Sequence, residues 1–257
     1  MASMRTESEH YRSVIKHYDR LANHGPYGTL APHNKGGRKS EYVAAVFDAA
    51  LLPLIAGAGR KAYFLDFGCG TGIFTRKVAP YMQHVAGVDV SGKILEVACR
   101  VCADLSNVSL HLTDGERLPF EDCSFDWVAA REVLCCVPDD RLAVVLAEIC
   151  RVLKPGGRFM LLEQVSDNPY WQYHPLSRSV KRAPATLRQF AEEAGFYIGD
   201  EFMVRTPRFP WIYPIWLGLV PRTFIPWLAR LEVAWHRRSH IHPRRWWNMV
   251  FVLVKPQ

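Results

Sequence analysis

The sequence predicts an α/β fold, a doubly wound and mostly parallel sheet with helices on both faces. Beyond residue 61, short apolar runs alternate with segments of helical periodicity, which is the order typical of a parallel sheet. The run at 62–67 has few polar positions, as expected for a strand covered on both sides. A glycine-rich turn follows at 68–72 and predicts a ligand loop at the carboxyl end of that strand.

Composition narrows the class of protein. Of the 257 residues, 49% are hydrophobic, which allows a substantial core and argues against disorder. The first residues lack the apolar segment of a signal peptide, and no uncharged apolar run approaches the length of a membrane span. The seven cysteines have no regular spacing, which favours a reducing compartment. We therefore expect a cytoplasmic protein.

Two helices are expected ahead of the sheet. Tyr11, Val14, Tyr18 and Leu21 share one helical face, and a second helix is expected at 41–55. The stretch 24–40 between them is rich in Gly, Pro, Asn and Lys and has no periodicity, which predicts a loop of the lid type. We assign residues 1–60 to this N-terminal helical cover.

The remaining elements follow in order. Strands are expected at 62–67, 85–89, 108–113, 127–131, 158–163, 196–204 and 250–254, and helices near 74–81, 91–101, 139–153 and 187–194. Ser91 is expected to cap the second of these helices, and Asp139 or Asp140 the third. This places a ligand-binding core at 61–205, an insert at 206–245 and a final core strand at 246–257.

The glycine spacing restricts the ligand. A dinucleotide fingerprint needs glycine at the sixth position from Gly68, but Ile73 stands there, and the Gly-Lys-Ser/Thr of a P-loop is absent. Asp89 ends the second strand about twenty residues after the glycines, where a carboxylate can accept hydrogen bonds from ribose hydroxyls. The pattern favours a nucleotide-like ligand, and a tight turn without a ligand is the structural alternative.

Five segments together carry a family resemblance. They are Leu65-Asp66-x-Gly68-x-Gly70-x-Gly72, Val88-Asp89-x-Ser91, Asp114-Gly115-Glu116-x-Leu118-Pro119-Phe120, Phe125-Asp126 and Leu153-Lys154-Pro155-Gly156-Gly157. In order and spacing this series resembles class I S-adenosylmethionine-dependent methyltransferases over residues 40–200, most of all the ubiquinone and menaquinone methyltransferase type. The resemblance implies a Rossmann-like sheet with an antiparallel last strand and S-adenosylmethionine as cofactor. It also implies methyl transfer to a small molecule, lipid-like in the branch named. We expect the methylated atom to be an oxygen or nitrogen and no metal to be needed, and the basic C-terminal segment favours an anionic acceptor.

The resemblance also assigns cofactor contacts. The loop that includes Asp66, Gly68, Cys69 and Gly70 would hold the methionine part, and Asp89 the ribose. Asp114 and Gly115 would meet the adenine edge, with Val90 and Glu116 flanking the ring. The first helix would close over the cofactor through Tyr11 and Tyr18, for which core packing is the alternative.

The chain departs from the family after the fourth strand. Relatives often carry a histidine there, whereas this chain has Arg131 and Glu132. Arg131 is a candidate for contact with the cofactor carboxylate or the acceptor, and Glu132 for positioning an acceptor hydroxyl or amine; a salt bridge with neighbours is the alternative for both. His174, in an aromatic loop, is the candidate general base because a neutral imidazole accepts a proton near neutral pH.

The insert at 206–245 is aromatic and basic. Six of the eight tryptophans lie between Trp211 and Trp247, and residues 202–257 hold nine Lys or Arg but one acid, Glu232. Phe224, Trp227, Leu228, Leu231 and Trp235 share one helical face. Three interpretations stay open: a cap on the acceptor pocket, a contact with a membrane surface, or a homodimer contact.

Other functions remain as alternatives. RNA methylation would use the basic insert, but no RNA-binding module is visible, so nucleic acid is the least favoured partner. A cofactor-binding protein without catalysis, or a peripheral membrane protein on the same scaffold, would keep the same motifs.

Overall fold

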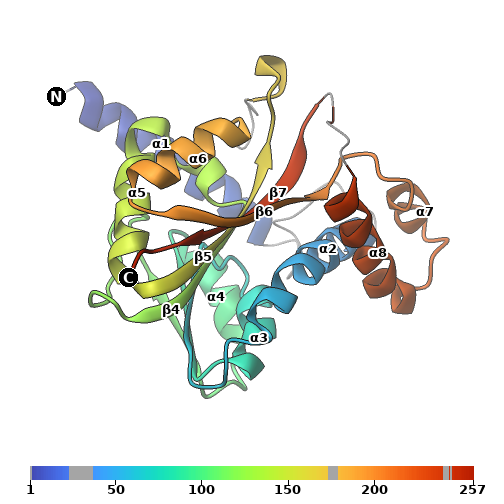
Figure 1. Cartoon of the computed structure of the whole chain (residues 1–257), viewed down its shortest axis with the longest axis horizontal. Helices are drawn as coiled ribbons and strands as arrows, with labels where there is room; N and C mark the ends of the chain where they lie inside the picture. The colour runs from blue at the N-terminus through green and yellow to red at the C-terminus, as the bar shows by residue number, and fades with distance from the viewer. Residues whose placement is uncertain (1, 23–36, 173–178, 240–242, 244) are drawn as a thin grey trace.

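The computed structural model describes residues 2–22, 37–172, 179–239, 243 and 245–257, without the side chains of 2–11 and 171. Their strands form one seven-stranded sheet in the order β3-β2-β1-β4-β5-β7-β6 (Figure 1). The strands are β1 (Tyr63–Phe67), β2 (His84–Asp89), β3 (Val108–Leu112), β4 (Phe125–Arg131), β5 (Leu153–Val165), β6 (Tyr197–Arg205) and β7 (Trp247–Val254). The pairs among β1 to β5 are parallel, and β7 is antiparallel to both β5 and β6. The predicted fold class, including the antiparallel last strand, is confirmed.

Helices cover both faces of the sheet. They are α1 (Ala2–Leu21), α2 (Arg38–Ile55), α3 (Ile73–Val78), α4 (Gly92–Val101), α5 (Asp139–Val152), α6 (Pro184–Glu193), α7 (Ile212–Trp216) and α8 (Ile225–Arg238). Adjacent residues of β1 face opposite layers: Phe64 belongs to the buried cluster that includes α2 and α3, and Leu65 to the cluster that includes α5 and α6. Such alternation in a strand buried on both faces explains why the sequence reads as a continuous apolar run.

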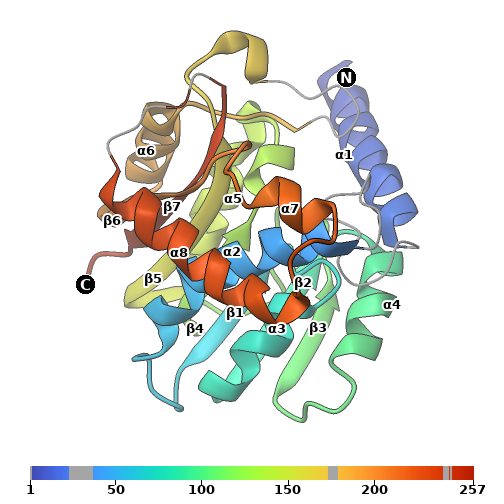
Figure 2. The ribbon, with the colours of Figure 1, turned by 90° about the vertical axis from the view of Figure 1, so that its right-hand side faces the viewer.

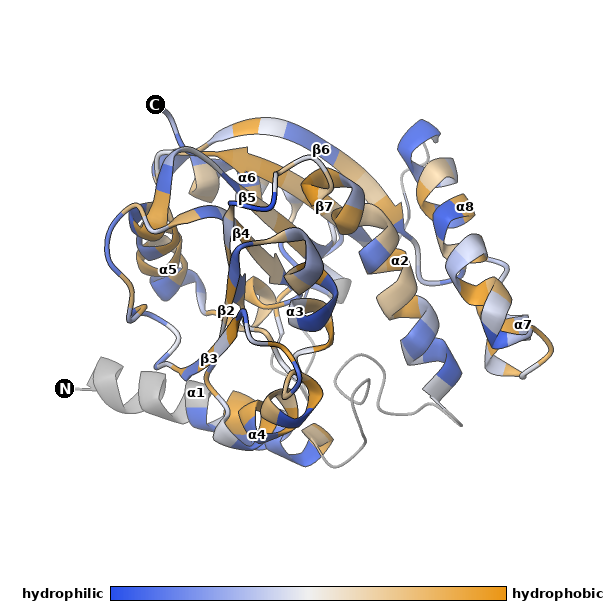
Figure 3. Cartoon of the chain, turned by 90° about the horizontal axis from the view of Figure 1, so that it is seen from below, coloured by the Kyte–Doolittle hydropathy of each residue, from blue (hydrophilic) through white to orange (hydrophobic). Residues whose placement is uncertain are grey.

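The insert adds a further layer outside α2. Both α7 and α8 lie beyond α2 as seen from the sheet, at the outer edge of the molecule (Figures 1 and 3), and in Figure 2 they lie in front of α2. Ile215 and Leu228 are buried in the same cluster as Val46 and Phe47 of α2. Among the described helices, none combines the length and apolar character needed to cross a bilayer.

Of the two helix caps predicted from the sequence, the structure confirms the one on α4 and not the one on α5. Ser91 caps α4 by accepting a hydrogen bond from the backbone N–H of Ile94. The expected cap at Asp139 or Asp140 is wrong: α5 begins at Asp139 behind Pro138, without a side-chain cap. Asp139 instead pairs with the buried Arg182 at 2.7 Å, because the ion pair offers a stronger partner than a backbone N–H.

Candidate active site

A pocket lies at the carboxyl ends of β1, β2 and β4, next to α1. The first βα turn, the end of β2, the turn after β3 and the segment after β4 line it, and α1 contributes Val14 and Tyr18. Parallel strands bring these ends to one edge of the sheet, where α/β proteins bind ligands. Of the residues singled out from the sequence, the structure brings together here Tyr18, Gly68, Gly70, Asp89, Val90, Gly115, Arg131 and Glu132.

The glycine loop passes tightly between β1 and the segment after β4. Gly68 and Cys69 both donate their backbone N–H groups to Val88 O at 2.9 Å. Gly68 has a φ of 71°, and a Cβ there would lie 2.4 Å from a γ-carbon of Val133. A Cβ on Gly70, whose φ is 55°, would meet no atom within 4 Å. Gly68 is therefore required for packing, whereas Gly70 leaves its side of the loop open to the pocket.

Asp89 ties three segments together at the pocket. Its carboxylate accepts hydrogen bonds from the N–H of Gly70 at 3.0 Å and of Ser91 at 2.9 Å. Burial raises its pKa above the ordinary value. The Ser91 hydroxyl donates to Asp19 of α1 at 2.5 Å, so the helix beside the pocket is fastened to the same turn. No local sequence pattern indicates the role of Asp19, because it depends on a contact between segments 72 residues apart.

Two predicted loop residues support the loop from behind. Asp66 is buried and accepts a 2.6 Å hydrogen bond from the Thr75 hydroxyl, and burial raises its pKa despite the nearby Arg131. Cys69 is buried toward Gly87, and burial raises the pKa of its thiol. Neither is among the described residues that line the pocket.

Arg131 presents a buried cation to the pocket. Its guanidinium lies 3.9 Å above the Phe74 ring, and its Nη1 is 3.6 Å from Asp48 Oδ1. That Nη1 is buried and makes no hydrogen bond with the described residues. A buried N–H without an acceptor destabilises the folded state, unless a ligand, a water molecule or an undescribed residue accepts its hydrogen bond.

Glu132 is held at the pocket by two amides. Its Oε1 accepts from Gln164 Nε2 at 2.8 Å and from Asn248 Nδ2 at 2.7 Å. Its backbone has a φ of 57°, in the left-handed region that non-glycine residues rarely occupy. Strained residues of this kind cluster at functional sites. The sequence pointed to Glu132 but not to its partners, because Asn248 is 116 residues away along the chain.

Glu163 lies directly behind this segment, and no sequence pattern singles it out. Its Oε1 accepts from the N–H groups of Val133 at 3.0 Å and Leu134 at 2.7 Å. Burial, and next the nearby Glu132, raise its pKa to about 8. The second oxygen has no hydrogen-bond partner among the described residues, which fits a protonated, neutral carboxyl group.

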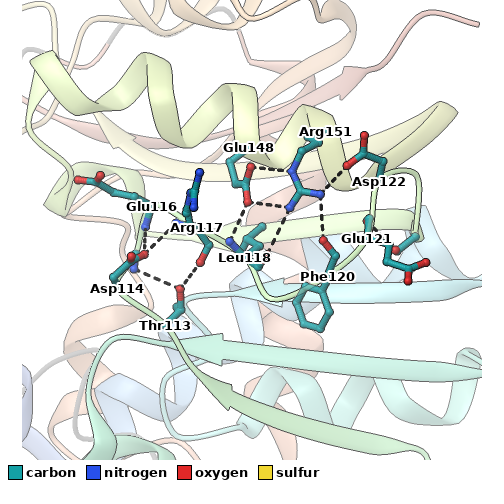
Figure 4. A network of polar contacts seen from close by, with 12 residues as sticks. Thr113, Asp114, Glu116, Arg117, Leu118, Phe120, Glu121, Asp122, Glu148 and Arg151 are labelled. Atoms are coloured by element: carbon teal, nitrogen blue, oxygen red, sulfur yellow. Dashed lines mark hydrogen bonds and ion pairs between the residues drawn. The ribbon is translucent and has the colours of Figure 1, made fainter.

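In the turn after β3, the Asp114 carboxylate holds the loop through hydrogen bonds to the backbone (Figure 4). Asp114 Oδ1 accepts from the N–H of Glu116 at 2.9 Å and of Arg117 at 2.8 Å, which leaves Gly115 at the pocket. The Glu116 carboxylate pairs with Arg141 of α5, with Nε at 2.7 Å. The structure therefore directs the Glu116 side chain to α5, and only Gly115 of these three lines the pocket.

Of the predicted site residues Tyr11, Tyr18 and His174, the structure describes the side chain of Tyr18 alone. Tyr18 lines the pocket, with its hydroxyl 3.4 Å from Cys136 Sγ. The proximity of Cys136, and next burial, raise the pKa of Tyr18. Tyr11 lies in α1, but its side chain is outside the described residues, as is the whole of His174.

The insert lies apart from the pocket lining. None of the described lining residues comes from 206–245, so the cap interpretation gains no support from them. The shared face expected on α8 is divided: Leu228 is buried, whereas Trp227 is 58% and Trp235 59% exposed. Glu232, expected off the apolar face, is fully buried and bonded to the Tyr42 hydroxyl.

Comparisons with known proteins show similarity to methyltransferases over part of the chain. Residues 65–161 match the methyltransferase domain model. Demethylmenaquinone methyltransferase from Staphylococcus aureus (strain MRSA252) is 44% identical over 162 residues, 60% of this chain and 58% of the relative. The chain spans 40 to 58% of the length of the curated relatives it matches first.

Two solved structures share the fold. Phosphoethanolamine N-methyltransferase 2 from Haemonchus contortus, in complex with S-adenosyl-L-methionine, aligns with a TM-score of 0.63 and 23% identity, over 82% of this chain and 52% of that one. Geranyl diphosphate C-methyltransferase from Streptomyces coelicolor A3(2) aligns with a TM-score of 0.61 and 17% identity, over 81% and 77%. At these identities the likeness concerns the fold alone.

Proposed function

We infer the reaction from the premise that this chain carries a class I S-adenosylmethionine-dependent methyltransferase domain of the quinone methyltransferase type. The proposed reaction moves the methyl group of S-adenosylmethionine to a nucleophilic atom of a small-molecule acceptor. S-Adenosylmethionine supplies an electrophilic methyl group on a sulfonium. The protein then has to bind both reactants in line and exclude water, which can supply much of the rate enhancement.

The pocket residues fit the cofactor. Asp89 ends β2 as a carboxylate suited to ribose hydroxyls, and Gly70 leaves open space beside the loop. The buried Arg131 Nη1, without a hydrogen bond from the described residues, is a donor for the cofactor carboxylate. Tyr18 and Val14 of α1 would close the pocket and keep water from the sulfonium.

The proposed binding of the methyl acceptor rests on how the Glu132 carboxylate is held. Two amides fix its Oε1, and among the described residues none donates to Oε2. A carboxylate held in this way can accept a hydrogen bond, and then a proton, from an acceptor hydroxyl or amine. We assign Glu132 to this positioning and proton-accepting role, and His174 stays a second candidate base outside the described residues.

The acceptor we propose is a largely apolar molecule with one hydroxyl or amine, such as a phenol or quinol. Phe67, Val133 and Val137 supply apolar walls next to Glu132. The relatives named as demethylmenaquinone methyltransferases support a quinol-like class. Oxygen or nitrogen is the proposed site of methylation; a ring carbon activated by its deprotonated hydroxyl is the competing outcome, since one relative in fold is named as a C-methyltransferase.

Titration calorimetry tests cofactor binding first, with S-adenosylmethionine and separately with S-adenosylhomocysteine. We expect binding at about micromolar affinity or tighter, within the range of enzyme-substrate complexes. Turnover is then measured as S-adenosylhomocysteine release with phenolic and quinol acceptors, and the methylated atom is identified by NMR of the product. The proposal is overturned if neither ligand binds, or if RNA supports methyl transfer and small molecules do not.

A further inference from the structure

The outer side of α7, α8 and the turn between them carries large apolar side chains that contact solvent. We call this surface the aromatic face. Its exposed residues include Trp216, Leu217, Leu219, Phe224, Trp227 and Trp235, with exposed fractions between 45% and 73%. Figure 3 places α7 and α8 at the outer edge of the chain, with hydrophobic colouring at the outer end of α7. So large a cluster of exposed aromatic side chains is unusual on a solvent-facing surface and indicates an interaction site.

The fold does not need the aromatic face for its own packing. The opposite side of the two helices already supplies the core, through buried residues such as Ile215, Leu228 and Val233 that pack against α2. Phe224, just before α8, and Trp227, Leu231 and Trp235 within it follow one another at intervals of three or four residues, so they form a single outward stripe. A stripe of this kind on a stable helix is available to a partner.

The exposed charged residues within 206–239 are all positive. The single acid between 206 and 239, Glu232, is fully buried and bonded to Tyr42. Five arginines in the same range are exposed: Arg208, Arg222, Arg230, Arg237 and Arg238. Arg222 pairs with Glu41 and Arg237 with Asp200, whereas no ion pair with a described residue is seen for Arg230 or Arg238. The surface is therefore apolar and cationic.

We propose that the aromatic face docks the protein on an anionic lipid bilayer. Tryptophans favour the headgroup level of a membrane, because the ring has an apolar body and a polar N–H. Arginines that flank such a stripe add attraction to lipid phosphates, and a helix with apolar and basic sides lies flat in the interface. The described helices do not span a bilayer, so this is a contact with one leaflet.

Charge argues against a second copy of this chain as the occupant. A twofold contact would place the aromatic face of one copy on that of another, and the flanking arginines of both copies would then face each other. Like charges brought together at a contact destabilise it. An anionic membrane surface complements the same residues, which is why we commit to it.

The test is vesicle flotation of the whole protein without cofactor or acceptor. Vesicles of phosphatidylcholine alone are compared with vesicles that also contain phosphatidylglycerol, at low and high NaCl. We expect binding to the anionic vesicles that weakens as salt screens the charges. The assay contains neither cofactor nor acceptor, so a lack of vesicle binding says nothing against methyl transfer. A lack of methyl transfer likewise leaves the membrane contact untouched.

Variants separate the two contributions. Arg230→Ala with Arg238→Ala should weaken partitioning by about 20- to 30-fold, at about fivefold for each arginine. Trp227→Ala with Trp235→Ala should weaken it at least about fivefold through lost apolar contact. The matched controls are Arg100→Ala on α4 and Tyr197→Ala on β6, both exposed and outside the insert, and they should bind like the parent protein.

Three outcomes overturn the proposal. The first is equal binding, or none, to neutral and anionic vesicles at low salt. The second is a stable dimer in analytical ultracentrifugation that Trp227→Ala dissociates, since the face would then serve self-association. The third is preferential binding to single-stranded RNA that displaces the protein from anionic vesicles. Circular dichroism of each variant checks that the substitution leaves the fold intact.

Discussion

The side-chain amide of Asn248 donates a 2.7 Å hydrogen bond to Glu132 Oε1, linking the antiparallel strand β7 to the pocket residue after β4. Asn248 is fully buried, and its Oδ1 lies 3.4 Å from the Arg205 guanidinium. The last strand of the sheet thus sets the orientation of the carboxylate to which we assign the acceptor.

Asn248→Ala should lower kcat with little change in cofactor affinity. Loss of a hydrogen bond to a charged group corresponds to about a 10- to 100-fold decrease. Steady-state kinetics and calorimetric titration with S-adenosylmethionine measure the two quantities. Gln83→Ala, which removes an exposed amide, is the matched control. Unchanged kcat in the Asn248 variant would refute a positioning role for this residue.

Asp89→Ala should weaken S-adenosylmethionine binding by at least about 100-fold. The variant removes the carboxylate proposed for the ribose and also the acceptor of the Gly70 and Ser91 N–H groups. Trp227→Ala, on the aromatic face, should leave the affinity unchanged. Calorimetry measures both, and an affinity retained in the Asp89 variant would contradict the site assignment.

Gly68→Ala should destabilise the protein by about 2–4 kcal/mol, because the new Cβ combines left-handed backbone strain with a clash against Val133. Gly57→Ala is the control, since a Cβ there meets nothing within 4 Å. Urea unfolding gives the free energy of unfolding of each variant. Equal stability of the two would argue that the loop adjusts without cost.

Glu163→Gln should flatten the pH dependence of stability between pH 6.5 and 8. The folded pKa of Glu163 is about 8 against an ordinary 4.5, so in this range the folded state binds a proton that the unfolded state has lost. The free energy of unfolding therefore falls as pH rises, by up to about 1.4 kcal/mol per pH unit. His236 contributes a slope of opposite sign near pH 6.5, because burial lowers its folded pKa to about 4 while an unfolded histidine still binds protons there. This contribution fades by about pH 7.5, so the fall due to Glu163 is clearest between pH 7 and 8.

The control for that prediction is Glu232→Gln. Burial raises the pKa of Glu232 to about 7, so this variant should flatten the profile mainly below pH 7 and leave the fall between pH 7 and 8 in place. Urea unfolding across the pH series distinguishes the two glutamates. A parent profile without any fall between pH 7 and 8 would show that Glu163 is not protonated in the folded state.

The sequence by itself determined the order of the elements and the position of the glycine loop. Local signals were sufficient for these: apolar runs end at the strand ends, Gly68 and Gly72 mark the turn, and Ser91 caps α4. The family resemblance added the antiparallel last strand, which the register of β5 with β7 confirms. It also placed Asp89, Arg131 and Glu132 near one another, because parallel strands end at the same edge of a sheet.

Only the tertiary structure decided which side chains hold the site and which surface the insert presents. Gln164 and Asn248 reach Glu132 from 32 and 116 residues away, and no local pattern encodes such contacts. Periodicity grouped Leu228 with Trp227 and Trp235, but α2 covers one side of α8 alone, so Leu228 is buried and the tryptophans remain exposed. Helical spacing defines a stripe of residues, whereas burial depends on the neighbour against which the helix packs.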